Sequence, residues 1–113
     1  MKGLKYTIAQ TRETVALAKQ IEQDLRVRRI VLNNGWIPDW SNFAKPKYFV
    51  FMYENQKLDI EAHYSINSSP VFGYFESLEK AKQFVDEQRE ELEWYFTEYI
   101  SVRDELELLL VEV

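Results

Sequence analysis

The chain has 113 residues and a mass of 13.6 kDa, contains no cysteine, and is 46% hydrophobic and 15% aromatic. This length predicts one domain, residues 1–113; the apolar content is too high for a disordered chain, and the lack of thiols excludes disulfides and thiolate metal sites. The net charge of −5 is uneven, because residues 1–75 carry ten Lys or Arg against seven Asp or Glu (+3) and residues 76–113 carry four against twelve (−8), which disfavours direct nucleic-acid binding.

Residues 1–35 are predicted to form a helix. The start, MKGLKYTIAQ, is polar within a few residues, so no secretory signal is expected. Thr7 and Gln10 have the spacing of a capping box. An apolar stripe follows, formed by Ile8, Val15, Ala18, Ile21, Leu25 and Leu32. The basic run RVRR (26–29) suits the negative end of the helix dipole, and Asn34-Gly35 with Pro38 beyond it predicts the end of the helix.

Residues 36–76 are predicted to be a tryptophan-rich loop and an antiparallel sheet. We expect Trp36 and Trp40 to close the junction between helix and sheet, with Asp39 and Ser41 fixing a turn by hydrogen bonds to nearby backbone. Three strands are predicted in a meander, KYFVFMY (47–53), LDIEAHYSI (58–66) and VFGYFE (71–76), separated by the turn-prone ENQK and NSSP. The first strand has apolar residues on both faces, so another element or a partner must cover its second face.

Residues 77–113 are predicted to form a long acidic helix, because two series of mostly apolar residues recur every seven positions without any Gly or Pro. One series is Leu78, Val85, Leu92, Tyr99, Leu106 and Val113; the other is Ala81, Gln88, Tyr95, Val102 and Leu109. Ser101 and Asp104 could begin a new helix, so one interruption is possible. The longest aliphatic run, 108–111, is too short to span a bilayer, and a cytoplasmic protein without membrane contact is expected.

The residue inventory gives little support for catalysis. There is one histidine, the three glycines are isolated, and no phosphate-binding loop is present. Asp59, Glu61 and His63 alternate on one strand face and could ligate a divalent metal. Same-side neighbours on a strand lie roughly 6.5 to 7 Å apart, however, so a solvated polar face is the better interpretation. We therefore expect neither a metal nor a cofactor.

Aromatic residues are abundant in the sheet segment and allow a second kind of site. Phe49, Phe51, Tyr53 and Lys47 could form a ligand face on which a nucleotide stacks, with Arg26, Arg28 or Arg29 as further contacts for its phosphates. Few Lys or Arg lie between the aromatic residues, so packing in a core or an oligomer is the stronger explanation.

The stretch LNNGWIPDWSN followed by KPKYFVFMY resembles a motif of small phage- and prophage-encoded proteins of unknown function, of the type common in Bacteroidetes. VFGYFESLEKAKQF is similar to the later strand and Ser-led helix of that group. The resemblance covers roughly residues 25–90 and implies a viral accessory protein, but it supplies no activity or residue roles. The approach Lys45-Pro46-Lys47 and the heptad-bearing tail depart from the group's pattern.

These patterns predict an α+β domain that is not an enzyme. The first functional hypothesis is a phage protein that inhibits a host protein, for example as an anti-CRISPR, through acidic residues of the last helix. These residues are Glu87, Glu90, Glu91, Glu98, Asp104 and Glu105. The alternative is a small-ligand binder that uses the aromatic sheet face. We also expect a homodimer or larger homo-oligomer, although residues 102–113 could instead fold back over the sheet. The contact surface of the expected oligomer, its seam, would be formed by Leu92, Tyr95, Tyr99, Val102, Leu106, Leu109 and Val113.

Overall fold

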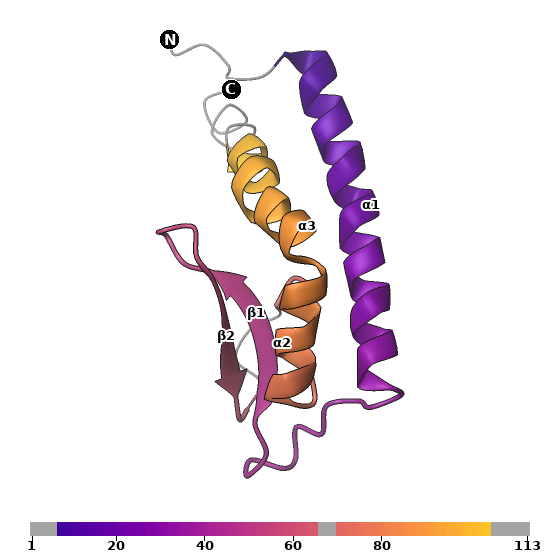
Figure 1. Ribbon diagram of the computed structural model, residues 1–113, viewed down its shortest axis with the longest axis vertical. Coiled ribbons are helices and arrows are strands. Elements are labelled where there is room, and N and C mark those ends of the chain that lie inside the picture. Colours follow the sequence, from indigo (N-terminus) through magenta and orange to yellow (C-terminus); the bar gives the residue numbers. More distant parts are fainter. Residues whose placement is uncertain (1–6, 66–69, 105–113) are drawn as a thin grey trace.

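The computed structural model describes residues 7–65 and 70–104. Their elements are helix α1 (Ile8–Asn33), strands β1 (Lys47–Met52) and β2 (Leu58–His63), helices α2 (Leu78–Glu87) and α3 (Arg89–Trp94), and the π-helical segment η1 (Tyr95–Tyr99), after which helix continues to residue 104. The elements form three layers, with α2 and the following helical segments between α1 and the β1–β2 hairpin (Figure 1).

Helix α1 follows the prediction closely. Thr7 and Gln10 form the capping box, each side chain accepting the other's backbone N–H at 2.9 to 3.1 Å. The helix ends where Asn34 and Gly35 take left-handed conformations, with φ of +49° and +87°. Ala18 and Leu25 are buried in the core, and Ile21 and Leu32 pack against it. The predicted cap and stop are therefore confirmed, as is the inward stripe at Ala18, Ile21, Leu25 and Leu32. Residues 1–6 of the predicted range lie outside the described residues.

The sheet has two strands, so the predicted three-stranded meander is wrong. Strands β1 and β2 pair antiparallel from Lys47↔His63 to Met52↔Leu58 around the predicted turn. The segment expected to be the third strand contributes only an isolated bridge, in which Phe75 and Tyr48 exchange backbone hydrogen bonds of 2.7 and 3.0 Å. A turn closes from Gly73 N–H to the Pro70 carbonyl, and Ser77 caps α2, so too few residues remain between them for a strand.

Gly73 explains why this segment turns at that point. Its φ is +82°, and a Cβ added to it would lie 2.6 Å from Nε of Arg29. Glycine therefore meets both the backbone conformation and the close approach of α1. A Gly within an alternating pattern can indicate a bend rather than a continuous strand, and here it does.

The C-terminal segment is not one long helix, which corrects the heptad-based prediction. The helix breaks at Gln88, whose φ and ψ are −116° and 23°. The later segment η1 is a wider, π-helical turn, because Ile100 N–H donates to the Tyr95 carbonyl five residues earlier. Gln88 is the only polar member of the two heptad series, and the break leaves it half-exposed. A straight helix would have kept Gln88 on the inward seam, whereas the break lets α2 pack on the hairpin and η1 pack on α1. The alternative interruption at Ser101 is not observed, since helix continues from 100 to 104.

Aromatic side chains from the segment before α2 fill the space between the layers. Phe75 and Phe84 have ring centroids 4.8 Å apart, and Phe72 lies 5.2 Å from the ring of Tyr95. The Tyr95 hydroxyl donates to the Glu22 carboxylate across the contact with α1. Burial, and next this hydrogen bond, raise the pKa of Tyr95 well above that of a free phenol. The helical layer is thereby fixed to α1 by both packing and a polar contact.

Asn33, at the end of α1, binds the chain segment that sequence patterns assigned to a third strand. Its side chain is buried, donates to the Tyr74 carbonyl at 2.8 Å and accepts from Glu76 N–H at 3.1 Å. One amide thus satisfies two backbone groups that a neighbouring strand would otherwise pair with.

Replacing Asn33 with alanine should therefore lower the free energy of unfolding by about 2 kcal/mol, since two backbone groups lose their partner. Urea unfolding followed by circular dichroism measures the loss. Asn55→Ala is the matched control, because Asn55 accepts a single hydrogen bond in the exposed hairpin turn. Equal losses in the two variants would contradict this role for Asn33.

Candidate functional site

The face of the hairpin that points away from α2 is the most distinctive surface of the described residues. Strand register places Phe49 and Phe51 on this face, with Tyr53 just beyond them, and Asp59, Glu61 and His63 beside them on β2. We name these six residues the outer sheet face. The opposite face, with the buried Val50, packs on α2. The outer sheet face is thus a row of aromatic rings next to a row of polar groups.

The aromatic row is continuous. The rings of Phe49 and Phe51 are 5.8 Å apart, and those of Phe51 and Tyr53 are 4.6 Å apart in an edge-to-face arrangement. At one end Tyr74 covers the row, 6.0 Å from Phe49 and edge-on to Trp40 at 4.8 Å. At the other end Tyr53 is 43% exposed. The predicted apolar second face of β1 is therefore covered at one end only among the described residues.

Lys47 does not extend over the outer sheet face. It is 2% exposed, its ammonium group donates to the Asn42 carbonyl at 2.7 Å, and it lies 5.1 Å from the ring of Trp40. The sequence suggested that this cation would contact phosphate, and the structure places it inside the Trp-rich loop instead. Burial of this strand lysine requires the carbonyl of Asn42 and the ring of Trp40 to fold back over it from the preceding loop, which strand alternation does not predict.

The Trp-rich loop, residues 34–46, joins α1 to β1 near this point. Asp39 Oδ1 accepts hydrogen bonds from both the backbone and the hydroxyl of Ser41, which also lower the pKa of Asp39, as the sequence led us to expect for this turn. Trp36 and Trp40 are half-buried, and Trp36 lines a groove of about 570 Å³ next to the start of α2.

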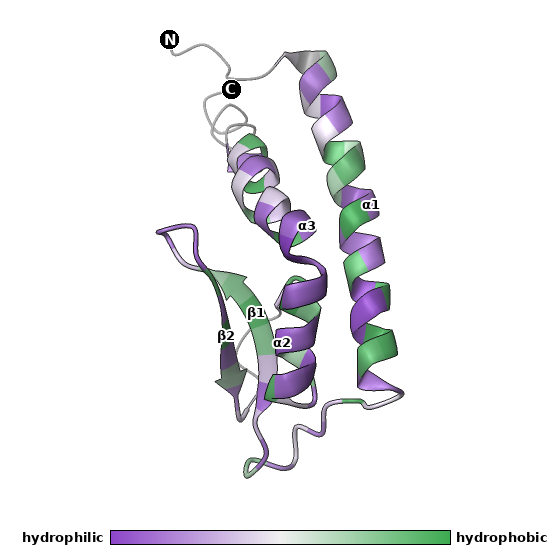
Figure 2. Cartoon of the chain, in the orientation of Figure 1, coloured by the Kyte–Doolittle hydropathy of each residue, from purple (hydrophilic) through white to green (hydrophobic). Residues whose placement is uncertain are grey.

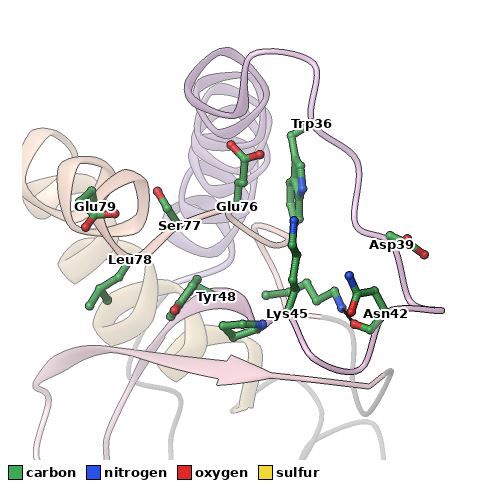
Figure 3. A pocket seen from close by; sticks show the side chains of 11 residues that line it. Trp36, Asp39, Asn42, Lys45, Tyr48, Glu76, Ser77, Leu78 and Glu79 are labelled. Carbon is green, nitrogen blue, oxygen red and sulfur yellow. Dashed lines mark hydrogen bonds between the residues drawn. The ribbon is translucent and has the colours of Figure 1, made fainter.

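Figure 3 shows this groove, with Trp36 beside Glu76 and Lys45 between the loop and the strand. Lys80 already neutralises Glu76 at 2.6 Å, and Ser77 accepts the Lys80 N–H as the cap of α2. The groove lining contains charges of both signs, and the Ser77 hydroxyl in it serves as the cap of α2. We assign no chemistry to it. Sequence reasoning did not find this groove, because its lining comes from two stretches that are far apart in the chain, 36–48 and 76–79.

The three candidate metal ligands do not converge. Asp59 Oδ1 accepts the N–H of Ile60 at 2.8 Å, and His63 Nδ1 lies 3.0 Å from the Tyr74 hydroxyl. Within residues 7–65 and 70–104, no three His, Asp or Glu side chains are grouped to hold a metal ion.

The basic run near the end of α1 makes contacts within the fold. Arg28 forms an ion pair of 2.6 Å with Glu87, and Arg26 donates to the Val71 carbonyl at 3.0 Å. Arg29 packs on Gly73, and burial followed by the nearby Arg26 lowers the pKa of Arg29. Its buried Nε has no hydrogen-bond partner among the described residues. Arg26, Arg28 and Arg29 connect α1 to the segment before α2 and to α2 itself, so they do not form a phosphate site with the aromatic row.

The predicted acidic helical face is divided by these contacts. Glu87 accepts from Gln83 and Arg28, and these hydrogen bonds lower its pKa. Asp104 lies 3.7 Å from Arg103, and Glu98 is exposed but has an interaction partner. Glu90 and Glu91 are exposed, with no ion pair or hydrogen bond among the described residues. In Figure 2 much of α2 and the start of α3 have the purple colour of hydrophilic residues. Glu105 lies outside the described residues.

The predicted oligomer seam is largely internal in the described part of the chain. Leu92, Tyr95 and Val102 are 0 to 2% exposed within one copy of the chain, and Tyr99 is half-buried beside Tyr95. The remaining seam positions, Leu106, Leu109 and Val113, lie outside the described residues, as does most of the alternative fold-back segment. Three seam residues therefore have intrachain partners, which the heptad pattern could not distinguish from interchain ones.

Comparison with protein-family models, with curated proteins and with solved structures found no match to this chain. The resemblance to small phage proteins accordingly stays a prediction. No helix among the described residues is long and apolar enough to cross a membrane.

Proposed function

We propose that this chain is a non-enzymatic accessory protein, of phage or prophage origin, that binds and inhibits a basic host protein in the cytoplasm. A counter-defence inhibitor such as an anti-CRISPR is the kind of protein meant. The observation that carries the proposal is the pair of exposed carboxylates Glu90 and Glu91 on α3, which have no partner among the described residues.

Unpaired carboxylates favour recognition of a basic surface for an electrostatic reason. Exposed charges contribute modestly to affinity, but a patch of one sign accelerates encounter with a partner of the opposite sign and disfavours acidic partners. Residues 76–113 carry −8 in total, so this potential extends beyond the two glutamates. The resulting association should weaken with salt, because salt screens exposed charges.

A binding role also fits the residues that would otherwise suggest catalysis. Asp59 holds a backbone amide, His63 contacts Tyr74, and Glu87 is paired with Arg28. Each of these groups has a structural partner within the fold. The nucleotide-binding alternative has less support, since Lys47 is buried and Arg28 is paired.

Affinity capture from bacterial lysate tests the proposal. The full-length protein should retain a basic protein at low salt and release it at high salt. Glu90→Lys/Glu91→Lys should weaken retention of that protein roughly tenfold or more, because two attractive charges become repulsive. The matched control is Glu13→Lys/Asp24→Lys, the same change of charge at exposed positions of α1.

The outcomes separate cleanly. Retention that both double variants reduce equally would reflect total charge and would contradict a role for α3. Retention that neither variant affects, or that salt does not weaken, would also contradict it. Inhibition is then tested by adding the protein to the captured partner and measuring that partner's activity, which should fall with the wild type and not with the α3 variant.

A further inference from the structure

The outer sheet face pairs two features that sequence analysis treated separately, aromatic rings and carboxylates. Register places Glu61 directly opposite Phe49 and Asp59 directly opposite Phe51. Side chains of directly opposed residues are neighbours across a strand pair. Each of the two half-buried phenylalanines of β1 therefore has a carboxylate opposite it.

We propose that the outer sheet face binds an extended basic segment of a partner protein, whose Arg or Lys side chains lie over the aromatic row and pair with Asp59 and Glu61. Aromatic faces attract cations, and guanidinium groups also stack on them. Carboxylates supply charge-assisted hydrogen bonds to the same cations. The site differs from the acidic face of α3, and it can exist whether or not α3 binds a partner.

Charge complementarity selects this occupant. Neither Asp59 nor Glu61 forms an ion pair with another described residue. Lys47, the one lysine of β1, is buried in the Trp-rich loop, and Lys57, exposed in the hairpin turn, pairs with neither carboxylate. Burial, and then the negative charges of Asp59 and Glu61, raise the pKa of Tyr53. The two carboxylates therefore act on this end of the aromatic row. An anionic ligand such as a nucleotide would be repelled here.

A second copy of the chain is a poor occupant of the same face. Two-fold pairing sets a surface against itself, and this surface would place carboxylates near carboxylates. Addition of a strand at the free edge of β2 is also opposed. The Ile60 N–H already donates to Asp59 Oδ1, so that edge amide is not open to a new strand. The groups available to a partner therefore lie on the outer sheet face and not at the edge of β2.

Nuclear magnetic resonance with isotope-labelled full-length protein tests the proposal, using the peptide acetyl-Arg-Thr-Arg-Thr-Arg-amide as the probe. Titration should shift amide signals of residues 49–53 and 59–63. The variant Asp59→Asn/Glu61→Gln should bind the peptide roughly tenfold more weakly, because it loses both charges while asparagine can still accept the Ile60 N–H. Phe51→Ala should also weaken binding while retaining both charges.

The control variant is Glu13→Gln/Asp24→Asn, which removes the same two charges from exposed positions of α1 and should change the affinity less than about twofold. Equal weakening in the two charge variants would mean attraction to overall charge and would overturn the site. Shifts confined to residues 89–104, or no shifts at saturating peptide, would overturn it as well. A concentration-dependent increase in mass that Phe51→Ala abolishes would identify a second copy as the occupant and would likewise contradict the proposal.

Discussion

Replacing Phe84 with alanine should lower the free energy of unfolding by about 3–5 kcal/mol, the range for truncating a fully buried aromatic side chain. Phe84 is 0% exposed and lies between the rings of Phe75 and Phe72, at 4.8 and 6.2 Å. It projects from α2, the middle layer, so its loss removes contacts in the central core. Urea or guanidinium unfolding followed by circular dichroism measures the change.

Phe43→Ala is the matched control for this prediction, because it makes the same chemical change at a loop position that is 66% exposed. We expect it to alter the free energy of unfolding by less than about 1 kcal/mol. Similar losses in the two variants would mean that Phe84 does not occupy the core described above. The comparison therefore tests the layered arrangement and not merely the presence of phenylalanine.

Leu92→Ala should lower the free energy of unfolding by about 2–5 kcal/mol, and this loss should not depend on protein concentration. Leu92 is 0% exposed within a single copy of the chain, so its contacts are made during folding and not by assembly. An interface residue would instead give an effect that changes with protein concentration, because dissociation is linked to unfolding. Unfolding at several concentrations, with light scattering on the folded protein, distinguishes these roles.

Leu17→Ala serves as the control for Leu92, since Leu17 is a helical leucine that is 49% exposed. Its loss should stay below about 1 kcal/mol. A stable Leu92→Ala variant whose mass is halved relative to the wild type would contradict the internal role and restore the predicted seam. The expected oligomer itself stays a prediction, since no partner chain is part of the structure.

Local sequence signals predicted α1 well because each of its determinants lies within a few residues of the helix. The capping box of Thr7 and Gln10 and the left-handed stop at Asn34 and Gly35 involve hydrogen bonds between near neighbours. The hairpin was predicted for the same reason: an alternating pattern and a short turn fix β1 and β2 locally. Such signals retain their meaning whatever the rest of the chain does.

The predicted third strand and single long helix failed because their local patterns also fit other structures. A short aromatic stretch such as 71–75 does not distinguish a strand from a core-filling segment. Here Gly73 bends this stretch, and the Asn33 side chain binds its backbone. A heptad repeat reports that one face is buried, but not whether the partner is a second copy, α1 or the hairpin. Because the helix breaks at Gln88, α2 packs on the hairpin and η1 packs on α1 of the same chain.

The candidate sites, like the fold, could be predicted from the sequence only in part. The sequence by itself determined the alternation that puts Phe49, Phe51, Asp59 and Glu61 on one face, since strand geometry places every second residue on the same side. Only the tertiary structure decided which charges remain available there. It buried Lys47 against Trp40, which lies 7 positions earlier in the chain. It also paired Glu87 with Arg28, which lies 59 positions earlier. Electrostatic character depends on these through-space neighbours, so composition predicted an acidic chain and folding determined where its unpaired carboxylates lie.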